Sequence, residues 1–417
     1  MRIAWNRLTM PLDLDYNTAS MNCTEMRAGF MKALVEAGHE ITIYAPMSKA
    51  STDVWKAYQN KMYERPNGDN WVDNTWIKHI KYEPLGFPSG NCDVMVCETA
   101  ATNWMFYNSL TKQPQMRRCA EIMDKFKGTV FMWQTDPDLS FPYYKMTKAK
   151  RDWNHKKNPY KPDKTTTGVK NLEDYGWATY DEIFKDKKHV VITFSTDVEK
   201  VKKEFCGSRD RYSYFVDKGL IEIIGAVTPF DPAYVEKVDF NVEPEFDVIY
   251  TGYPRGRENR FKPFFTEAVG GKIKSAVTGP WSKKKNIPEG LLPESTTDIG
   301  FLKNFCELPH CTNRSKALLH LGVPKARKFG WTTSRIIEAV YSGVVVYYDA
   351  ELKCYDDILG KEFALHSSEE AKKVWRDVSK MKNKERSKLW RTQWKRYKKY
   401  TWKRYVTKFE GWIEKYS

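Results

Sequence analysis

No apolar run in this 417-residue chain approaches the roughly 20 residues that a membrane-spanning helix requires. The N-terminus also lacks the charged, apolar and small-residue succession of a signal peptide, and it opens with the strand-like segment RIAWN. Both absences argue against a membrane protein and against a secreted one. We therefore expect a cytoplasmic protein that does not bind membranes.

The eight cysteines form no Cys-x-x-Cys pair. A chain of this size does not need a disulfide framework, so reduced thiols are expected. Cys306 and Cys311 flank His310, which could indicate a zinc site. The rest of the chain contains no second group of Cys and His residues with the spacing of zinc ligands. The sequence therefore predicts no metal site. A divalent metal is compatible with it, but nothing in the sequence indicates one.

Positive charge is in excess, with 69 Lys and Arg against 53 Asp and Glu and a formal net charge of +16. An excess of this sign favours a polyanionic partner, with nucleic acid ahead of an anionic membrane surface. Hydrophobic residues make up 41% and charged residues 29%, which is typical of a globular protein. The length is sufficient for two domains.

Strand and helix patterns alternate along most of the chain. Expected strands at 2–6 and 40–44 flank an expected helix at 23–37, which predicts a parallel sheet with right-handed crossovers. A polar segment at 48–91 reads as an excursion from this pattern. Prolines between 228 and 244 mark a linker, after which the α/β pattern restarts. We predict two Rossmann-like domains, 1–235 and 236–385, and a closing helical segment, 386–417.

That closing segment is dense in Lys, Arg, Trp and Tyr. Its aromatic residues fit an amphipathic helix that packs on the body of the protein, and its cations also fit a DNA-contact face. The sequence leaves both interpretations open.

The stretch Trp331–Glu351 combines a short helix with a buried strand. Thr332 to Tyr341 reads as the helix, and Thr332, Thr333 or Ser334 can cap it. Gly343 ends the helix, and the β-branched and aromatic run 344–348 forms the strand. The helix carries Arg335 and Glu338, three residues apart. They fit either a surface ion pair or a nucleotide grip, with arginine on a diphosphate and glutamate on ribose hydroxyls.

A second arginine-bearing segment follows the expected strand FDVIYT. Its loop, GYPRGRENR, starts at Gly252 and carries Arg255, Arg257 and Arg260. Glycine after a strand permits close backbone approach, and arginine suits phosphate. The loop lacks the Gly-Lys-Ser/Thr ending of a P-loop. We expect phosphate binding here.

Two carboxylates are candidates for catalysis. Asp136 follows the expected strand TVFMW, where it fits either an ordinary Asp-Pro turn or a general base at the mouth of a cleft. Glu25 fits either a capping box with Asn22 or a contact with substrate. The basic segment 143–164 reads as either a solvated loop or a DNA-facing loop. Its candidate phosphate contacts are Lys145, Lys148, Lys150 and Arg151.

Four segments, in the same order along the chain, resemble the DNA β-glucosyltransferases of T-even bacteriophages, which modify 5-hydroxymethylcytosine in duplex DNA. The segment FDVIYTGYPRGRENR is similar to the strand and arginine loop that hold the UDP diphosphate. Gly252 and Arg255 match, whereas the family's second arginine falls on Asn259, between Arg257 and Arg260. The other three similar segments are SRIIEAV, FMWQTDPDLSFP and the Thr24-Glu25 pair.

The resemblance implies an α/β GT-B fold, with two Rossmann-like domains facing across a cleft and a C-terminal helix closing back. It also implies a UDP-sugar co-substrate bound by Gly252 and the arginines, with Glu338 on ribose. Asp136 would be the catalytic base of an inverting transfer to duplex DNA containing hydroxymethylated cytosine, and Glu25 would contact the sugar. We expect a monomer acting in the cytoplasm of an infected bacterial host. The alternative is a GT-B enzyme with a small-molecule, lipid or polysaccharide acceptor.

Overall fold

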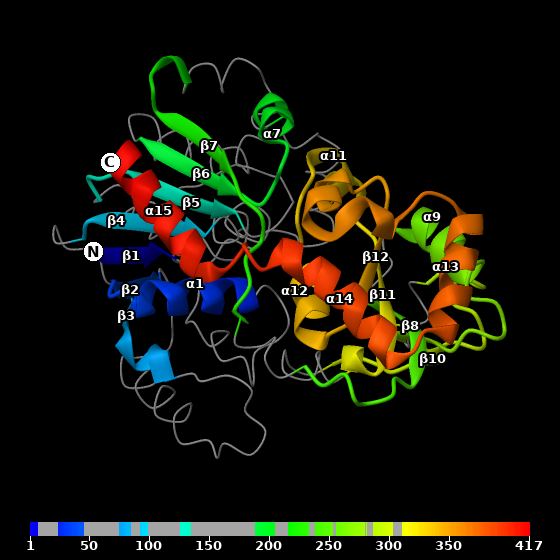
Figure 1. The fold of residues 1–417 in the computed structure, drawn as a ribbon. Coiled ribbons are helices and arrows are strands. Elements are labelled where there is room, and N and C mark those ends of the chain that lie inside the picture. Colours follow the sequence, from blue (N-terminus) through cyan, green and yellow to red (C-terminus); the bar gives the residue numbers. More distant parts are fainter. Residues whose placement is uncertain are drawn as a thin grey trace, which may run out of the picture.

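Two parallel β-sheets organise the chain (Figure 1). The computed structural model describes residues 1–6, 24–45, 75–84, 92–98, 126–134, 188–204, 216–232, 238–252, 256–279, 281, 287–302 and 311–417. The first sheet has seven strands, in the spatial order β3 (Ile80–Pro84), β2 (Glu40–Ala45), β1 (Arg2–Asn6), β4 (Val94–Glu98), β5 (Val130–Gln134), β6 (His189–Thr193) and β7 (Ile221–Gly225).

The second sheet has six strands, and every neighbouring pair in both sheets is parallel. Its order is β10 (Thr297–Asp298), β9 (Ser275–Thr278), β8 (Phe246–Thr251), β11 (Ser315–His320), β12 (Val345–Asp349) and β13 (Ala364–Leu365). In each sheet the order reverses beside the first strand, β1 or β8. A doubly wound sheet binds ligands at such a switch point, outside the carboxyl ends of its strands.

The described α-helices cover the sheets and bridge them. They are α1 (Thr24–Glu36), α7 (Val198–Glu204), α9 (Glu258–Phe261), α11 (Pro324–Phe329), α12 (Arg335–Ser342), α13 (Ser368–Lys380), α14 (Asn383–Tyr397) and α15 (Trp402–Tyr416). Shorter helices of other types are η2 (Thr75–His79), η5 (Lys262–Thr266), η7 (Lys353–Tyr355), η8 (Asp356–Gly360) and η9 (Lys361–Phe363).

The central strands are buried along their whole length, including the polar residues that they contain. Every residue of β6, β8, β11 and β12 is buried. Strands of a parallel sheet are covered by helices on both faces, so they need no polar alternation. The expected end of α12 also holds, because Gly343 follows it with φ of 66°.

The start of α12 differs from the sequence expectation. The helix begins at Arg335 and not at Thr332, because Thr332 is part of the domain junction. Its hydroxyl donates to the Phe194 carbonyl at 3.1 Å and accepts from the Thr228 amide at 3.0 Å. Thr332 therefore joins β6, the linker and the second domain instead of capping the helix.

The segment 48–91, which the sequence suggests is an excursion, contains the edge of the first sheet. Within it, η2 and β3 are described, and β3 pairs with β2 from Ile41 opposite Ile80 to Ala45 opposite Pro84. Trp76 and Ile77 are buried beneath this edge. The expectation was wrong for these ten residues, since short apolar runs between polar neighbours concealed a helix turn and a strand.

The C-terminal segment forms two helices that span the junction. In Figure 1, α14 crosses from the second sheet toward the first, and α15 lies over the first. Gln393 of α14 accepts from the Val346 amide at 3.0 Å and donates to its carbonyl at 2.7 Å. Phe409 of α15 packs edge-on against Phe30 of α1, with centroids 5.2 Å apart. The expected helical return to the first domain is confirmed.

The first sheet ends at Gly225 and the second begins at Phe246, so the change of sheet falls between them. The boundary we expect at 235/236 lies outside the described residues. Among the described helices, none has the length and apolarity needed to cross a membrane.

Candidate active site

Polar and cationic side chains gather at the carboxyl edge of the second sheet. Gly252 follows β8, His320 ends β11, and Arg335 begins α12. Tyr250 and Arg257 complete the cluster around the end of β8. This edge is the place where doubly wound sheets bind ligands. We call these five residues the arginine site.

Gly252 is needed for the closeness of this packing. Its φ of 92° is unfavourable for residues with a side chain, and a Cβ there would overlap the guanidinium of Arg335. Its carbonyl accepts from the Trp281 indole at 3.0 Å, and its amide donates to the Thr278 carbonyl at 2.8 Å. The Arg335 guanidinium therefore packs directly against the backbone at Gly252, and only a residue without a side chain leaves room for it.

Arg257 and Arg335 lie close enough to repel each other electrostatically beside the buried ring of Tyr250. Arg335 donates from Nη1 to the tyrosine hydroxyl at 3.4 Å, and its guanidinium carbon lies 5.6 Å from the ring centroid. Burial and the charge of Arg335 lower the pKa of Arg257 to about 10, and interactions with Tyr250 and Glu258 oppose this shift more weakly. An anion placed between the two guanidinium groups would relieve their repulsion.

His320 is a third polar group at this edge. It is 1% exposed, and neither ring nitrogen has a hydrogen-bond partner among the described residues. Burial, and then the charges of Arg335 and Arg257, move its pKa well below the ordinary value, so the imidazole is neutral at pH 7. Its ring meets Tyr355 edge-on, with centroids 5.0 Å apart. A neutral imidazole has one N–H available to donate to a bound anion.

Arg260, expected among the phosphate contacts, makes ion pairs within the protein. Its Nε and Nη2 donate to the two carboxylate oxygens of Asp349, at 2.8 and 2.5 Å. Asp349 is fully buried at the end of β12, and Arg260 Nη1 also lies 3.2 Å from Glu351. This fork anchors the segment that carries Arg260 to the end of β12, which β11 separates from β8, and this is a positioning role.

Several expected site residues lie where the structure does not describe them: Asp136, Arg255, Lys145, Lys148, Lys150 and Arg151. Glu25 belongs to the first turn of α1 and Glu338 to α12, but only their backbones are described. Of the expected donor-binding residues, the structure brings Gly252, Arg257 and Arg335 together. Within the described residues, no group of three or more His, Cys, Asp or Glu gathers at a place that would hold a metal ion.

No family model and no curated protein matches this chain in sequence. Solved structures do match. The structure of T4 phage BGT in complex with its UDP-glucose substrate superposes with a TM-score of 0.58 at 13% identity, over 98% of this chain and 99% of that one. The same phage protein with UDP and Mn²⁺ gives a TM-score of 0.56 at 13% identity, over 98% and 99% of the two chains.

The fold is GT-B. Sucrose-phosphate synthase from Thermosynechococcus elongatus also superposes, with a TM-score of 0.52 and 11% identity, over 100% of this chain and 98% of that one. The fold class expected from the sequence is therefore confirmed, and so is the resemblance to the phage β-glucosyltransferase at the level of the fold.

Sequence reasoning missed His320 and Tyr250. Both belong to strands whose apolar residues indicate a buried core, and both are close to the carboxyl ends of those strands. The rule that draws attention to Asp136, a polar residue at the carboxyl end of a buried parallel strand, applies equally to His320. Applied to every strand, it would have included this histidine.

Proposed function

We propose that this protein transfers a sugar from a UDP-sugar to 5-hydroxymethylcytosine in duplex DNA. The observation that supports UDP-sugar binding is the closeness of Arg257 and Arg335. Both lie beside Gly252, at the carboxyl edge of the second sheet of a GT-B fold. Two like charges held together in a partly buried site suit a dianion. A diphosphate presents charge and acceptor oxygens to both guanidinium groups.

The proposed donor site uses Gly252 for close approach, and Arg255, Arg257 and Arg335 for the diphosphate. Glu338, one helical turn after Arg335, accepts the ribose hydroxyls. His320, at the end of β11, donates its single N–H to the anion. Since it stays neutral, it adds a hydrogen bond without adding a third positive charge.

The proposed chemistry is one in-line displacement. Asp136, two residues beyond β5, takes the proton of the hydroxymethyl group as the oxygen forms a bond to the anomeric carbon. The bond between that carbon and the diphosphate oxygen breaks, and its electron pair leaves with UDP. The arginines stabilise the charge that develops on UDP, Glu25 contacts the sugar, and the anomeric configuration inverts.

The DNA half of the proposal is supported by charge and by fold. The net charge of +16 provides affinity for phosphates independent of sequence, with Lys145, Lys148, Lys150 and Arg151 as contacts. The phage structure with the same fold is that of a DNA modifying enzyme, β-glucosyltransferase. A target base must leave the helical stack to reach a cleft, so base flipping is part of the proposal. The enzyme would act as a monomer in the cytoplasm of an infected bacterial host.

The test is a transfer assay with UDP-glucose and UDP-arabinose against duplex DNA containing cytosine or 5-hydroxymethylcytosine, read by nucleoside mass. We expect a sugar-sized mass gain on the hydroxymethylated DNA alone. The fold shared with sucrose-phosphate synthase makes a small-molecule acceptor the second candidate. Tight UDP binding without any gain on DNA would refute transfer of these two sugars to DNA, and would direct the search to other sugars or to a non-DNA acceptor.

A further inference from the structure

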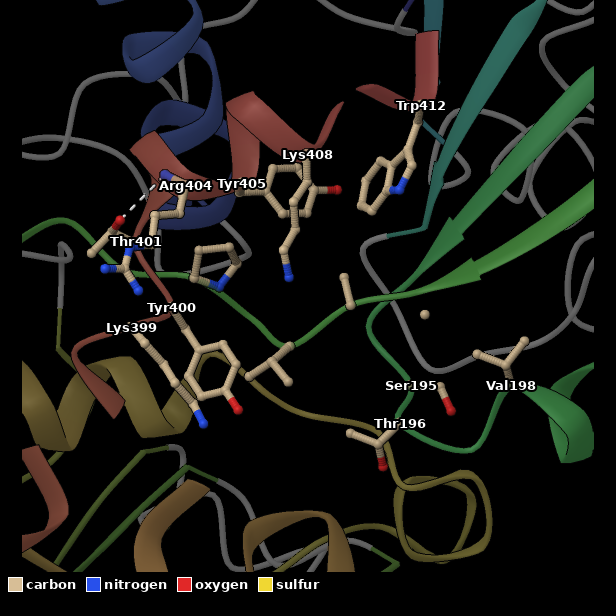
Figure 2. Close-up of a pocket in the computed structure, with 14 residues that line it drawn as sticks. Ser195, Thr196, Val198, Lys399, Tyr400, Thr401, Arg404, Tyr405, Lys408 and Trp412 are labelled. Carbon is tan, nitrogen blue, oxygen red and sulfur yellow. Dashed lines mark hydrogen bonds between the residues drawn. The ribbon is translucent and has the colours of Figure 1, made fainter. Parts of the chain in front are cut away.

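A cavity of about 530 Å³ lies where the first sheet, the linker and α15 meet. Its walls come from the carboxyl ends of β6 and β7, from linker residues 226–229, and from the first turns of α15 with the turn before it (Figure 2). A volume of this size is typical of small-ligand sites. No residue of the arginine site lines it, so it is a separate feature, and we call it the junction cavity.

The charged residues that line the junction cavity are all cations: Lys399, Arg404 and Lys408. All three side chains are exposed, and within the described part of the chain none of them forms an ion pair. Figure 2 shows Lys399 alongside Tyr400, while Lys408 and Trp412 project from α15 over the linker. Three cations around one cavity repel one another, so a bound anion would be favoured.

Carboxylates near the cavity are already engaged elsewhere, so they do not neutralise it. The nearby pairs are Asp197 with Lys200 at 2.7 Å, Asp231 with Lys32 at 2.6 Å, and Glu410 with His39 at 2.9 Å. The local sequence adds to the imbalance, because no Asp or Glu occurs between Arg386 and Phe409. Among the residues that the structure describes, these carboxylates therefore do not balance the positive charge at the cavity.

The N-terminal end of α15 reinforces that field. Thr401 caps the helix, with its hydroxyl accepting from the Arg404 amide at 3.3 Å, and Thr401 itself lines the cavity. The first turn of this 15-residue helix therefore lies at the cavity, where the positive end of the helix dipole adds to the positive potential. The rings of Tyr400 and Trp412 add apolar surface, on which the base of a free nucleotide can stack, and Lys399 Nζ lies 5.0 Å from the centroid of the Tyr400 ring.

We propose that the junction cavity is a phosphate-binding site, distinct from the donor site, in which Lys399, Arg404 and Lys408 contact the anion. The chemistry recognised is a phosphate group next to a planar ring. Duplex DNA and a free nucleotide both carry it, and the test distinguishes these two sources. The site is defined by binding alone, so it stands or fails independently of sugar transfer.

The first measurement is hydrogen exchange of the backbone amides in residues 399–412, with the full-length protein. Exchange is compared without ligand, with a 20-base-pair duplex, with UDP and with inorganic phosphate. Slower exchange with the duplex alone assigns the phosphate to nucleic acid. Slower exchange with UDP or inorganic phosphate assigns it to a free ligand, provided that the cavity variant described next abolishes the slowing. Unchanged exchange in all three, at concentrations at which the duplex is bound, refutes the site.

Two matched triple variants separate the cavity from net charge. The cavity variant is Lys399→Gln, Arg404→Gln and Lys408→Gln, and the control is Lys388→Gln, Arg391→Gln and Lys395→Gln, three exposed cations of α14 that do not line the cavity. Both remove three positive charges. We expect the cavity variant to lose the slowing of exchange and the control to retain it. Equal loss in both would show that net charge, and not the cavity, is responsible.

If the source is duplex DNA, the salt dependence of binding gives a second readout. The slope of log K against log salt concentration falls by about 0.9 for each phosphate contact removed. We expect the cavity variant to lower the slope by about 1 to 3 and the control by less than about 1. Matching slopes for the two variants would contradict a duplex bound at the cavity.

Discussion

Gly252 allows the sharpest test of the arginine site, because a near neighbour provides a matched control. Gly252 and Gly256 both have positive φ, 92° and 74°. A Cβ at Gly252 would overlap the guanidinium of Arg335, whereas a Cβ at Gly256 would meet nothing within 4 Å. Alanine at either position carries the backbone strain, but only alanine at Gly252 displaces the arginine.

The magnitudes follow from these two effects. The left-handed conformation costs alanine about 1–2 kcal/mol, partly offset by about 0.4–1 kcal/mol from the lower entropy of the unfolded chain. Each variant should therefore lose about 1 kcal/mol of stability. A hydrogen bond to a charged group contributes about 1.5–3 kcal/mol, so displacing Arg335 should weaken UDP binding about 10- to 150-fold.

The assay is calorimetric titration with UDP, alongside urea unfolding of each variant. We expect Gly252→Ala to lose UDP affinity and Gly256→Ala to retain it, with similar unfolding free energies. A folded Gly252→Ala protein with unchanged UDP affinity would refute the role of Arg335 at the diphosphate. Equal loss of affinity in both variants would attribute the effect to strain in the loop.

Three further predictions concern His320, Asp349 and Asp136. Because burial and two arginine charges lower the pKa of His320, the unfolded chain binds one proton more than the folded chain below pH of about 6.5. The free energy of unfolding should therefore fall as pH drops below that value, by at most about 1.4 kcal/mol per pH unit. The variant His320→Leu should remove this dependence, which urea unfolding between pH 5 and 7 would measure. Asp349→Asn should cost about 3–5 kcal/mol by breaking a buried pair with Arg260, whereas Glu245→Gln at an exposed pair should cost less than about 1 kcal/mol in the same measurement. Asp136→Asn should keep UDP affinity in titration and abolish transfer in the nucleoside mass assay, and normal turnover would remove it as the base.

The sequence predicts the strands well because their signals are local. The run 344–348 and the run FDVIYT are rich in β-branched and aromatic residues, and they lie at the positions of β12 and β8. Gly343 ends α12 for a reason that depends on one residue alone, its freedom to adopt positive φ. The site residues that the sequence places in segment 135–187, and Arg255 in the arginine loop, stay as predictions.

Long-range pairing is where local signals fail. Arg260 and Asp349 are 89 residues apart, and nothing in the loop GYPRGRENR shows that its last arginine is committed to a buried carboxylate. Thr332 fits a helix cap by sequence, but its hydroxyl contacts Phe194, 138 residues away. In both cases the sequence indicates a local or ligand-binding role for a polar side chain. The structure shows that its partner is instead a residue distant in the sequence.

The domain junction and the arginine site share one segment, which couples them mechanically. Thr332 bonds to Phe194 of the first domain and to Thr228 of the linker, and Arg335 begins α12 three residues later. The Tyr397 hydroxyl donates to the Thr228 carbonyl at 2.6 Å, which ties α14 to the same point. A rotation of the domains that disturbs these bonds displaces the start of α12, and with it the guanidinium packed against Gly252. Since two sites can influence each other only through an element that both contact, residues 331–335 are the place where domain closure and diphosphate binding would be linked.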